Sequence, residues 1–301
     1  MITITDLRKT YGTRAAVDDL SFNVASGRVT GFVGPNGSGK STTMRMMVGL
    51  TRPDHGSVTY DGVPYTKMRD PARVVGSVLD ARCMHPGRSA RKHLSSMAAL
   101  SRLPLARVDT ALGEVGLETA ADQRAGGFSL GMRQRLALAG ALLGDPEVLL
   151  LDEPFNGLGP DGIRWLRTYL TGFAQRGGSV FVSSHLIGEL AMFADDLVVI
   201  GAGKLLAAES VATITARNAK VVVVETVASG QLADLARHLT AAGLTVQTDG
   251  MKLLVHDSDR RVVAQIAQQQ HIPVLELTET SRSLEDSLLE LTASSAEFTS
   301  S

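Results

Sequence analysis

The sequence predicts an α/β domain over residues 1–210, with helices packed against a mixed sheet, followed by a small α+β module over residues 216–292. Three observations lead to this prediction. A strand-type run is followed by a glycine-rich loop and a helix-type run near residue 40, and a second buried-type strand ends in two acids near residue 152. After about residue 210 the composition changes, and the order of elements becomes strand, helix, strand, strand, helix, strand.

Length and composition agree with two folded domains. At 301 residues the chain exceeds the length at which one hydrophobic core usually stops growing. Hydrophobic residues make up 44% and charged residues 20%, and no apolar run approaches the roughly 18 residues needed to cross a bilayer. No basic segment precedes an apolar stretch at the amino terminus, so no secretory signal is expected. Cys83, the only cysteine, excludes an internal disulfide and favours a reducing, cytoplasmic compartment.

The charge balance argues against a nucleic-acid partner. The formal net charge is −1, and no long block of lysine or arginine is present to neutralise a phosphate backbone. The module that begins at residue 216 carries more acidic than basic residues. A nucleotide is therefore a better candidate ligand than a nucleic acid.

Within the first domain, the pattern predicts each element in turn. Residues 2–25 alternate apolar and polar residues on both sides of a turn at Tyr11 and Gly12, which is typical of an antiparallel sheet edge. Residues 86–145 lose strand character and are rich in alanine, leucine and arginine, which predicts a helical insertion. Further strands are expected at 28–33, 57–63, 74–79, 148–151 and 179–183, further helices at 42–50, 161–176 and 187–194, and a hairpin at 196–206.

The second domain is predicted in the same way. Its first helix-type stretch, 231–242, places Leu232, Leu235 and Leu239 on one side, as expected of a helix that covers a sheet. Strands are expected at 221–224, 244–247, 252–256 and 274–277, a second helix at 260–270 and a closing helix at 284–292. The small, polar residues 293–301 are expected to be disordered.

The glycine-rich loop fits the phosphate-loop pattern of Gly, four free positions, Gly, Lys and Ser or Thr, with Gly34, Gly39, Lys40 and Ser41 in the fixed places. Several backbone N–H groups of such a loop point into one concavity, and the following helix adds the positive end of its dipole. We expect the loop to hold a triphosphate, with Lys40 at the outer phosphates and the Ser41 hydroxyl on Mg²⁺. The predicted binding residues of the loop are Gly34, Pro35, Asn36, Gly37, Ser38, Gly39, Lys40, Ser41 and Thr42.

The second motif is the aliphatic strand Val148–Leu151, which is followed by Asp152, Glu153 and Pro154. A buried strand would deliver Asp152 rigidly to Mg²⁺ and Glu153 to a water molecule at the γ-phosphate. Two adjacent acids on a surface turn would normally be solvated charge. The strand, the proline that stops it and the upstream phosphate loop favour a catalytic role instead.

With these motifs in order, residues 1 to about 210 resemble the ATP-binding subunit of an ABC transporter, and more narrowly the single-domain ATPases of bacterial drug and antibiotic exporters of ABC-2 type. The resemblance implies a P-loop, ABC-type nucleotide-binding domain that binds and hydrolyses ATP with Mg²⁺. It places Tyr11 where the family stacks an aromatic ring on adenine, and His185 where the family has a histidine that contacts the γ-phosphate. The implied catalytic residues are Lys40, Glu153 and His185. The second domain is similar to an accessory domain of some of these ATPases.

The family signature Leu-Ser-Gly-Gly-Gln is represented here by Phe128–Met132. Ser129 and Gly131 keep the hydroxyl and the close-approaching backbone, whereas Leu130 and Met132 stand where the family has glycine and glutamine. By resemblance, Ser129, Leu130, Gly131 and Met132 face the ATP of the other subunit.

Two further positions depart from the family pattern. Asp80 falls where the family has a glutamine, and its carboxylate is a third candidate for contact with Mg²⁺ or its water, beside Ser41 and Asp152. Gly159 stands where an aspartate is usual, which predicts a weaker contact across the subunit interface.

The resemblance also implies partners. Two subunits would close head to tail, as a homodimer or with another ABC ATPase, each ATP lying between the phosphate loop of one and the signature of the other. A separate transmembrane permease would hold the protein at the inner face of the cell membrane. A cluster near the start of the insertion is expected to face this permease, although a solvated basic face fits equally well. The cluster consists of Arg82, Arg88, Arg91 and Lys92.

Three alternatives differ from this interpretation. A partner that binds ATP and hydrolyses it weakly, in a heterodimer with an active subunit, is favoured by the altered signature and Gly159 but opposed by Glu153 and His185. A soluble regulatory ATPase or translation factor would resemble a tandem duplication, whereas this chain has one phosphate loop. A P-loop kinase would not account for the signature.

Overall fold

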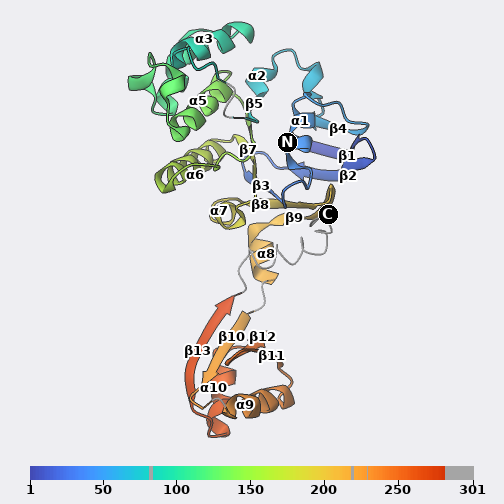
Figure 1. Ribbon diagram of the computed structural model, residues 1–301. Coiled ribbons are helices and arrows are strands. Elements are labelled where there is room, and N and C mark those ends of the chain that lie inside the picture. Colours follow the sequence, from blue (N-terminus) through green and yellow to red (C-terminus); the bar gives the residue numbers. More distant parts are fainter. Residues whose placement is uncertain (81–83, 218–219, 229, 282–301) are drawn as a thin grey trace. The chain divides into compact units, whose positions relative to one another are not determined.

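The computed structural model describes residues 1–80, 84–217, 220–228 and 230–281. The chain divides into two compact units (Figure 1). The first contains Met1–Val211, and the second begins at Ala212. Four features of the sequence lie outside the described residues, namely Arg82, Cys83, the closing helix expected at 284–292 and the tail at 293–301.

A six-stranded mixed sheet forms the centre of the first unit, in the strand order β5-β6-β7-β3-β8-β9. Five strands run parallel and the last is antiparallel, as predicted for a mixed sheet. Every residue of β3, β6 and β7 is buried because helices cover both faces of a parallel sheet, so these strands are largely apolar. The strands are β3 (Val29–Val33), β5 (Val75–Val78), β6 (Val148–Leu151), β7 (Ser179–Ser184), β8 (Asp196–Gly201) and β9 (Lys204–Ser210).

The antiparallel segment predicted over residues 2–25 is present, and it forms a separate sheet with a third strand. Its strands are β1 (Ile2–Tyr11), β2 (Arg14–Val24) and β4 (His55–Tyr60), in the order β2-β1-β4. Three phenylalanines join this sheet to the central one. The ring of Phe181 on β7 lies 5.8 Å from that of Phe22 on β2 and 5.0 Å from that of Phe32 on β3.

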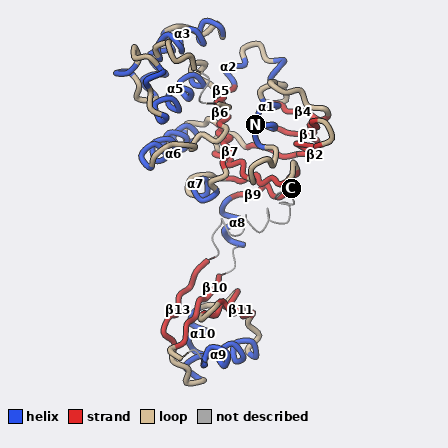
Figure 2. Tube along the Cα trace, viewed as in Figure 1, coloured by secondary structure: helices blue, strands red, loops and turns tan. Residues whose placement is uncertain are grey.

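Helices flank the central sheet, and Figure 2 separates them from the strands by colour. Figure 1 shows α6 and α7 on one side of the central strands, and α1 with the antiparallel sheet on the other. These helices are α1 (Lys40–Met47), α6 (Pro160–Gln175) and α7 (Ile187–Ala191). The predicted helical insertion contains α3 (Ala90–Leu100), α4 (Ala106–Glu114) and α5 (Leu130–Leu142), and no strand occurs in its described residues.

Some helices were not expected or begin elsewhere than predicted. The first helix begins at Lys40 rather than Thr42, because Gly39 already serves as its N-cap. The short helix α2 (Pro71–Val74) starts at a proline, whose fixed φ suits a first helical position. The helix α8 (Val211–Arg217) was also not expected, and it follows β9 directly.

The second unit contains the predicted order of elements and forms an antiparallel sheet in the order β11-β12-β10-β13. Leu235 and Leu239 of α9 and Val263 of α10 are fully buried against the sheet, because apolar residues of both helices face it. Its elements are β10 (Lys220–Thr226), α9 (Gly230–Ala241), β11 (Thr245–Asp249), β12 (Lys252–His256), α10 (Arg260–Gln269) and β13 (Val274–Ser281).

Removal of the Phe181 ring tests the junction between the two sheets of the first unit. We expect Phe181→Ala to lower the free energy of unfolding by about 3–5 kcal/mol, because it leaves a cavity among buried rings. Urea unfolding followed by the fluorescence of Trp165, the one tryptophan of the chain, reports on this unit. Leu100→Ala, at an exposed position, should change the free energy of unfolding by less than about 0.5 kcal/mol. Equal effects of the two substitutions would contradict the assigned core.

Candidate active site

Three adjacent parallel strands bring the predicted motifs to one edge of the central sheet. In the order β6-β7-β3, Leu151 lies opposite Val182 and Val33 lies opposite Ser184. The chain continues from β3 into the phosphate loop, from β6 into Asp152 and Glu153, and from β7 into His185. Because the carboxyl ends of parallel strands share one edge, these segments meet there.

The phosphate loop depends on a glycine just before the helix. Gly39 has a φ of 106°, a conformation that side chains rarely adopt, and a β-carbon there would lie 2.4 Å from the Ala16 carbonyl oxygen. Gly39 can therefore bring the chain against β2 and direct the first N–H groups of α1 into the concavity. A backbone cradle at a helix N-terminus fits an anionic phosphate group.

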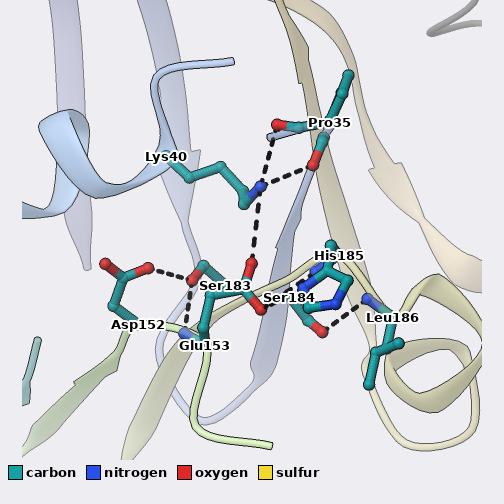
Figure 3. Close-up of polar contacts among 9 residues, drawn as sticks. Pro35, Lys40, Asp152, Glu153, Ser183, Ser184, His185 and Leu186 are labelled. Atoms are coloured by element: carbon teal, nitrogen blue, oxygen red, sulfur yellow. Dashed lines mark hydrogen bonds and ion pairs between the residues drawn. The ribbon is translucent and has the colours of Figure 1, made fainter. Parts of the chain in front are cut away.

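Lys40 is buried in the concavity of the loop, with 6% of the residue exposed. Its Nζ donates hydrogen bonds to the carbonyl oxygens of Gly34 at 2.7 Å and Pro35 at 3.2 Å, and it lies 3.7 Å from Glu153 Oε1 (Figure 3). Burial lowers the pKa of Lys40, and the negative charges of Glu153 and Asp152 oppose this shift. The site thus holds a cation in a poorly solvated place, where an anionic ligand would stabilise it.

Ser183, the fifth residue of β7, positions both acids. Its Oγ donates to Asp152 Oδ1 at 2.5 Å and accepts the backbone N–H of Glu153 at 2.9 Å (Figure 3). Glu153 has a φ of 48°, which is uncommon for a residue with a side chain. The buried serine hydroxyl therefore stabilises a strained backbone at the predicted catalytic residue. This role was not predicted, although two serines at the carboxyl end of a buried strand were a visible signal.

His185 contacts Glu153 twice. Its Nδ1 lies 2.8 Å from Glu153 Oε2, and its backbone N–H donates to the same oxygen at 3.3 Å. An ionised carboxylate can only accept, so Nδ1 is the donor of this bond. The structure therefore brings together Lys40, Glu153 and His185, the three residues predicted to be catalytic.

A cleft of about 420 Å³ opens beside these residues. It is lined by Tyr11, Arg14, Ala16, Asn36, Gly37, Gly39, Lys40, Ser41, Thr42 and Glu153. Tyr11, at the end of β1, is half exposed and thus presents an aromatic ring beside the phosphate loop. Arg14 was not predicted from the sequence, because one arginine after a turn carries no motif.

A larger cleft, of about 880 Å³, lies at the opposite ends of the strands, where Glu147, Val148 and Ser179 line it. It contains neither the phosphate loop nor the acids that follow β6. Backbone donors and a paired cation and carboxylate occur in the smaller cleft, which is the better candidate for chemistry despite its size.

The signature residues Ser129, Leu130, Gly131 and Met132 do not line the cleft of their own unit. Ser129 caps α5, its Oγ accepting the N–H of Met132 at 3.2 Å. The Leu130 side chain lies against Gly157, where a β-carbon would be 2.1 Å from Leu130 Cδ2. The signature is thereby packed against the segment that follows the two acids.

Asp80 and the basic cluster are less clearly connected to the cleft. Asp80 is exposed two residues after β5, and it does not line the cleft. Arg91 forms ion pairs with Asp109 and Asp122 inside the insertion. Arg88 and Lys92 are exposed. The charge of Arg91 is thus engaged locally, which leaves two described members of the cluster at the surface.

The donor set bears on the expected metal. Among the described residues, no group of three or more histidine, cysteine or acidic side chains could hold a metal ion. Ser41 and Asp152 offer one hydroxyl and one carboxylate, a set that suits Mg²⁺ when phosphate oxygens and water complete the coordination. Over the same part of the chain, every helix is too short or too polar to span a membrane.

Comparison with known proteins gives consistent similarities. Residues 17–156 match a family model described as ABC transporter, and residues 220–285 match one described as a domain of unknown function. The chain is 34% identical over 302 residues to the uncharacterized ABC transporter ATP-binding protein YhcH of Bacillus subtilis (strain 168), with 99% of this chain and 97% of that protein covered. It is also 34% identical to the bacitracin transport ATP-binding protein BcrA of Bacillus licheniformis, with 97% of each covered. A solved ATP-binding subunit of an ABC transporter matches with a TM-score of 0.65 and 24% identity, over 72% of this chain and 92% of that one.

Substitution of Gly39 tests the cradle. We expect Gly39→Ala to weaken nucleotide binding at least tenfold, because its β-carbon would collide with the Ala16 carbonyl and its φ is strained. Calorimetric titration with ATP measures the change. Gly127→Ala, whose β-carbon would meet no atom within 4 Å, should leave affinity unchanged. A Gly39→Ala protein that bound ATP normally would show that the cradle is not the binding element.

Proposed function

The chain belongs to the family of ABC transporter ATP-binding proteins and is an ATP hydrolase of that family, and we propose that it drives export through a separate membrane permease. The observation that carries the proposal is the convergence of Lys40, Glu153 and His185 beside a phosphate-binding loop. Lys40 Nζ lies 3.7 Å from Glu153, and Glu153 lies 2.8 Å from His185. A cation for the phosphates and a carboxylate that can orient water are groups that phosphoryl transfer to water uses, and the imidazole is in contact with that carboxylate.

Each of these residues has a distinct role in the proposed hydrolysis. Lys40 neutralises the outer phosphates. To do so, its ammonium group gives up hydrogen bonds to the loop carbonyls and forms them with phosphate oxygens. Glu153 orients the attacking water and accepts its proton as the water oxygen bonds to the γ-phosphorus and the bond to the ADP oxygen breaks. His185 holds the Glu153 carboxylate in place and contacts the γ-phosphate. Most of the rate enhancement comes from positioning and charge stabilisation.

Binding of the nucleotide divides between the loop and the hairpin of β1 and β2. The N–H groups around Gly39 and the start of α1 cradle the phosphates, and Tyr11 stacks on the base. Mg²⁺, held by Ser41 and Asp152, would supply charge neutralisation at the phosphate oxygens. The hydrogen bond from Ser183 to Asp152 supports this role, because it fixes the orientation of the carboxylate.

Transport requires further proteins in this proposal. Two copies close head to tail, so that Ser129 and Gly131 of one copy face the ATP of the other, and hydrolysis releases the pair. The N-terminus of α5, capped by Ser129, offers backbone donors for this contact. The permease would hold the protein at the inner face of the membrane, and the name of the bacitracin relative supports a drug or antibiotic as cargo.

One alternative is a subunit that binds ATP but hydrolyses it weakly beside an active partner. Leu130 and Gly159 favour it, since Leu130 changes the contact with the nucleotide of the other subunit and Gly159 weakens the contact across the subunit interface. The paired Glu153 and His185 favour hydrolysis, because both groups of the expected machinery are in contact.

The substitution Glu153→Gln separates binding from hydrolysis. We expect ATP turnover to fall at least about 100-fold, because the amide cannot accept the proton of water. ATP affinity should be kept or increased, because a negative charge leaves the cleft. Phosphate release and equilibrium titration measure the two effects, and Glu118→Gln on the exposed surface of the insertion is the matched control. Absence of turnover in the parent protein would favour the weakly hydrolysing alternative.

The same variant tests the proposed pair of subunits. With Mg²⁺ and ATP, Glu153→Gln should sediment at twice the monomer mass of 31.8 kDa, because ATP is trapped between two copies. Adding Gly131→Glu should return it to the monomer, because a carboxylate would face the γ-phosphate. Protein that binds ATP and remains monomeric would contradict a homodimer and favour a heterodimer.

A further inference from the structure

Arg14 is placed beside Tyr11 by the hairpin of the antiparallel sheet. Tyr11 ends β1, Arg14 begins β2, and the two residues are paired across a two-residue turn. Directly paired residues of antiparallel strands project their side chains on the same face. Both residues line the cleft of about 420 Å³. One end of the hairpin thus presents an aromatic ring and a guanidinium group to the same space.

The guanidinium group lies over the phosphate loop. Its Nη2 is 3.5 Å from the carbonyl oxygen of Gly37, which is a long and weak hydrogen bond. A phosphate oxygen is a better acceptor for arginine, because its charge strengthens the bond and its geometry allows two parallel bonds. The contact with Gly37 is therefore one that a phosphate group could replace with a gain in free energy.

The position of Gly37 indicates which phosphate is concerned. Ser41 and Thr42 lie in the first turn of α1, where a helix N-terminus attracts the inner phosphates. Lys40 Nζ is bonded to Gly34 and Pro35, so the ammonium group lies at the first half of the loop, where the outer phosphates are expected. Arg14 contacts Gly37, two residues after Pro35, from another element, and it lines the same cleft as Lys40 and Glu153. It is also exposed, so it can move towards a ligand without leaving a packed core.

The charges that line the cleft agree with this assignment. Arg14 and Lys40 are its cations, and Glu153 is the acid among its described lining residues. Glu153 lies 3.7 Å from Lys40 and therefore compensates the buried cation before a ligand binds. A third phosphate brings additional negative charge, and Arg14 is the second cation in the lining of the cleft that can help Lys40 to neutralise it.

We propose that Arg14 is a specificity-determining residue that binds the outermost phosphate of ATP from the β1–β2 hairpin and so favours ATP over ADP. The inference rests on the proposed function, since it assumes that the cleft binds ATP. Because Arg14 and Tyr11 share one hairpin end, the contact also draws the aromatic ring towards the bound nucleotide. Release of phosphate after hydrolysis removes the contact and weakens the hold of the hairpin on the product.

Binding of a β,γ-imido analogue of ATP and of ADP, both with Mg²⁺, tests the proposal by calorimetry. We expect Arg14→Gln to weaken binding of the ATP analogue about tenfold, as for loss of a charge-assisted hydrogen bond, and that of ADP less than twofold. Arg14→Lys should give an intermediate loss for the ATP analogue, because it keeps the charge without the planar fork. Retained ADP binding shows in the same experiment that the variants are folded.

Arg8→Gln is the matched control. Arg8 lies on the same hairpin, 3.5 Å from Asp18, and does not line the cleft, so its loss should change neither affinity more than twofold. Equal weakening of both nucleotides by Arg14→Gln and Arg14→Lys would overturn the proposal and indicate contact with the base or ribose. Unchanged binding of the ATP analogue would overturn it as well. Failure of the parent protein to bind either nucleotide would instead refute the proposed function.

Discussion

The pairing of β6, β7 and β3 as neighbouring parallel strands is the constraint on which the active site depends. These three strands are completely buried, so neither the strands nor the points where they end can shift without disturbing the core. The phosphate loop, Glu153 and His185 come from distant parts of the chain, yet they meet because their strands end at one edge. The site is therefore as rigid as the sheet, and loop flexibility is not needed to assemble it.

This rigidity holds a site that is unfavourable by itself. Lys40 keeps a charge in a place that water barely reaches, with two carbonyl groups and one carboxylate in contact with it. Glu153 has an uncommon backbone conformation that the Ser183 hydroxyl stabilises. Stability gained in the aromatic and aliphatic core between the sheets offsets both costs. A nucleotide reduces the first cost, because its phosphates bring negative charge close to the buried Lys40 ammonium group.

Local patterns predicted the bounds of two strands. The strands β6 and β12 have the predicted bounds because short aliphatic runs between turn residues have one interpretation. Sheet order was not predictable, because nothing in Val148–Leu151 tells which strand lies beside it. The phosphate loop was recognised from its spacing, whereas Ser183 and Arg14 act through neighbours that only the folded chain brings near. The proline-initiated helix α2 was missed because four residues are too few for a periodic pattern.

Because Leu130 contacts Gly157, the side chain that can occupy one of these positions depends on the residue at the other, although the two are far apart in the sequence. A side chain at 157 would occupy the space that the Leu130 isobutyl group fills, so it would be accommodated only after residue 130 became smaller or moved. With glycine at 130, as the family signature has it, the steric restriction on 157 would be lifted, whereas the φ of 72° at Gly157 would still disfavour a side chain. Substitutions at the two positions are thus expected to be epistatic, and the order in which they arise would decide whether the intermediate folds.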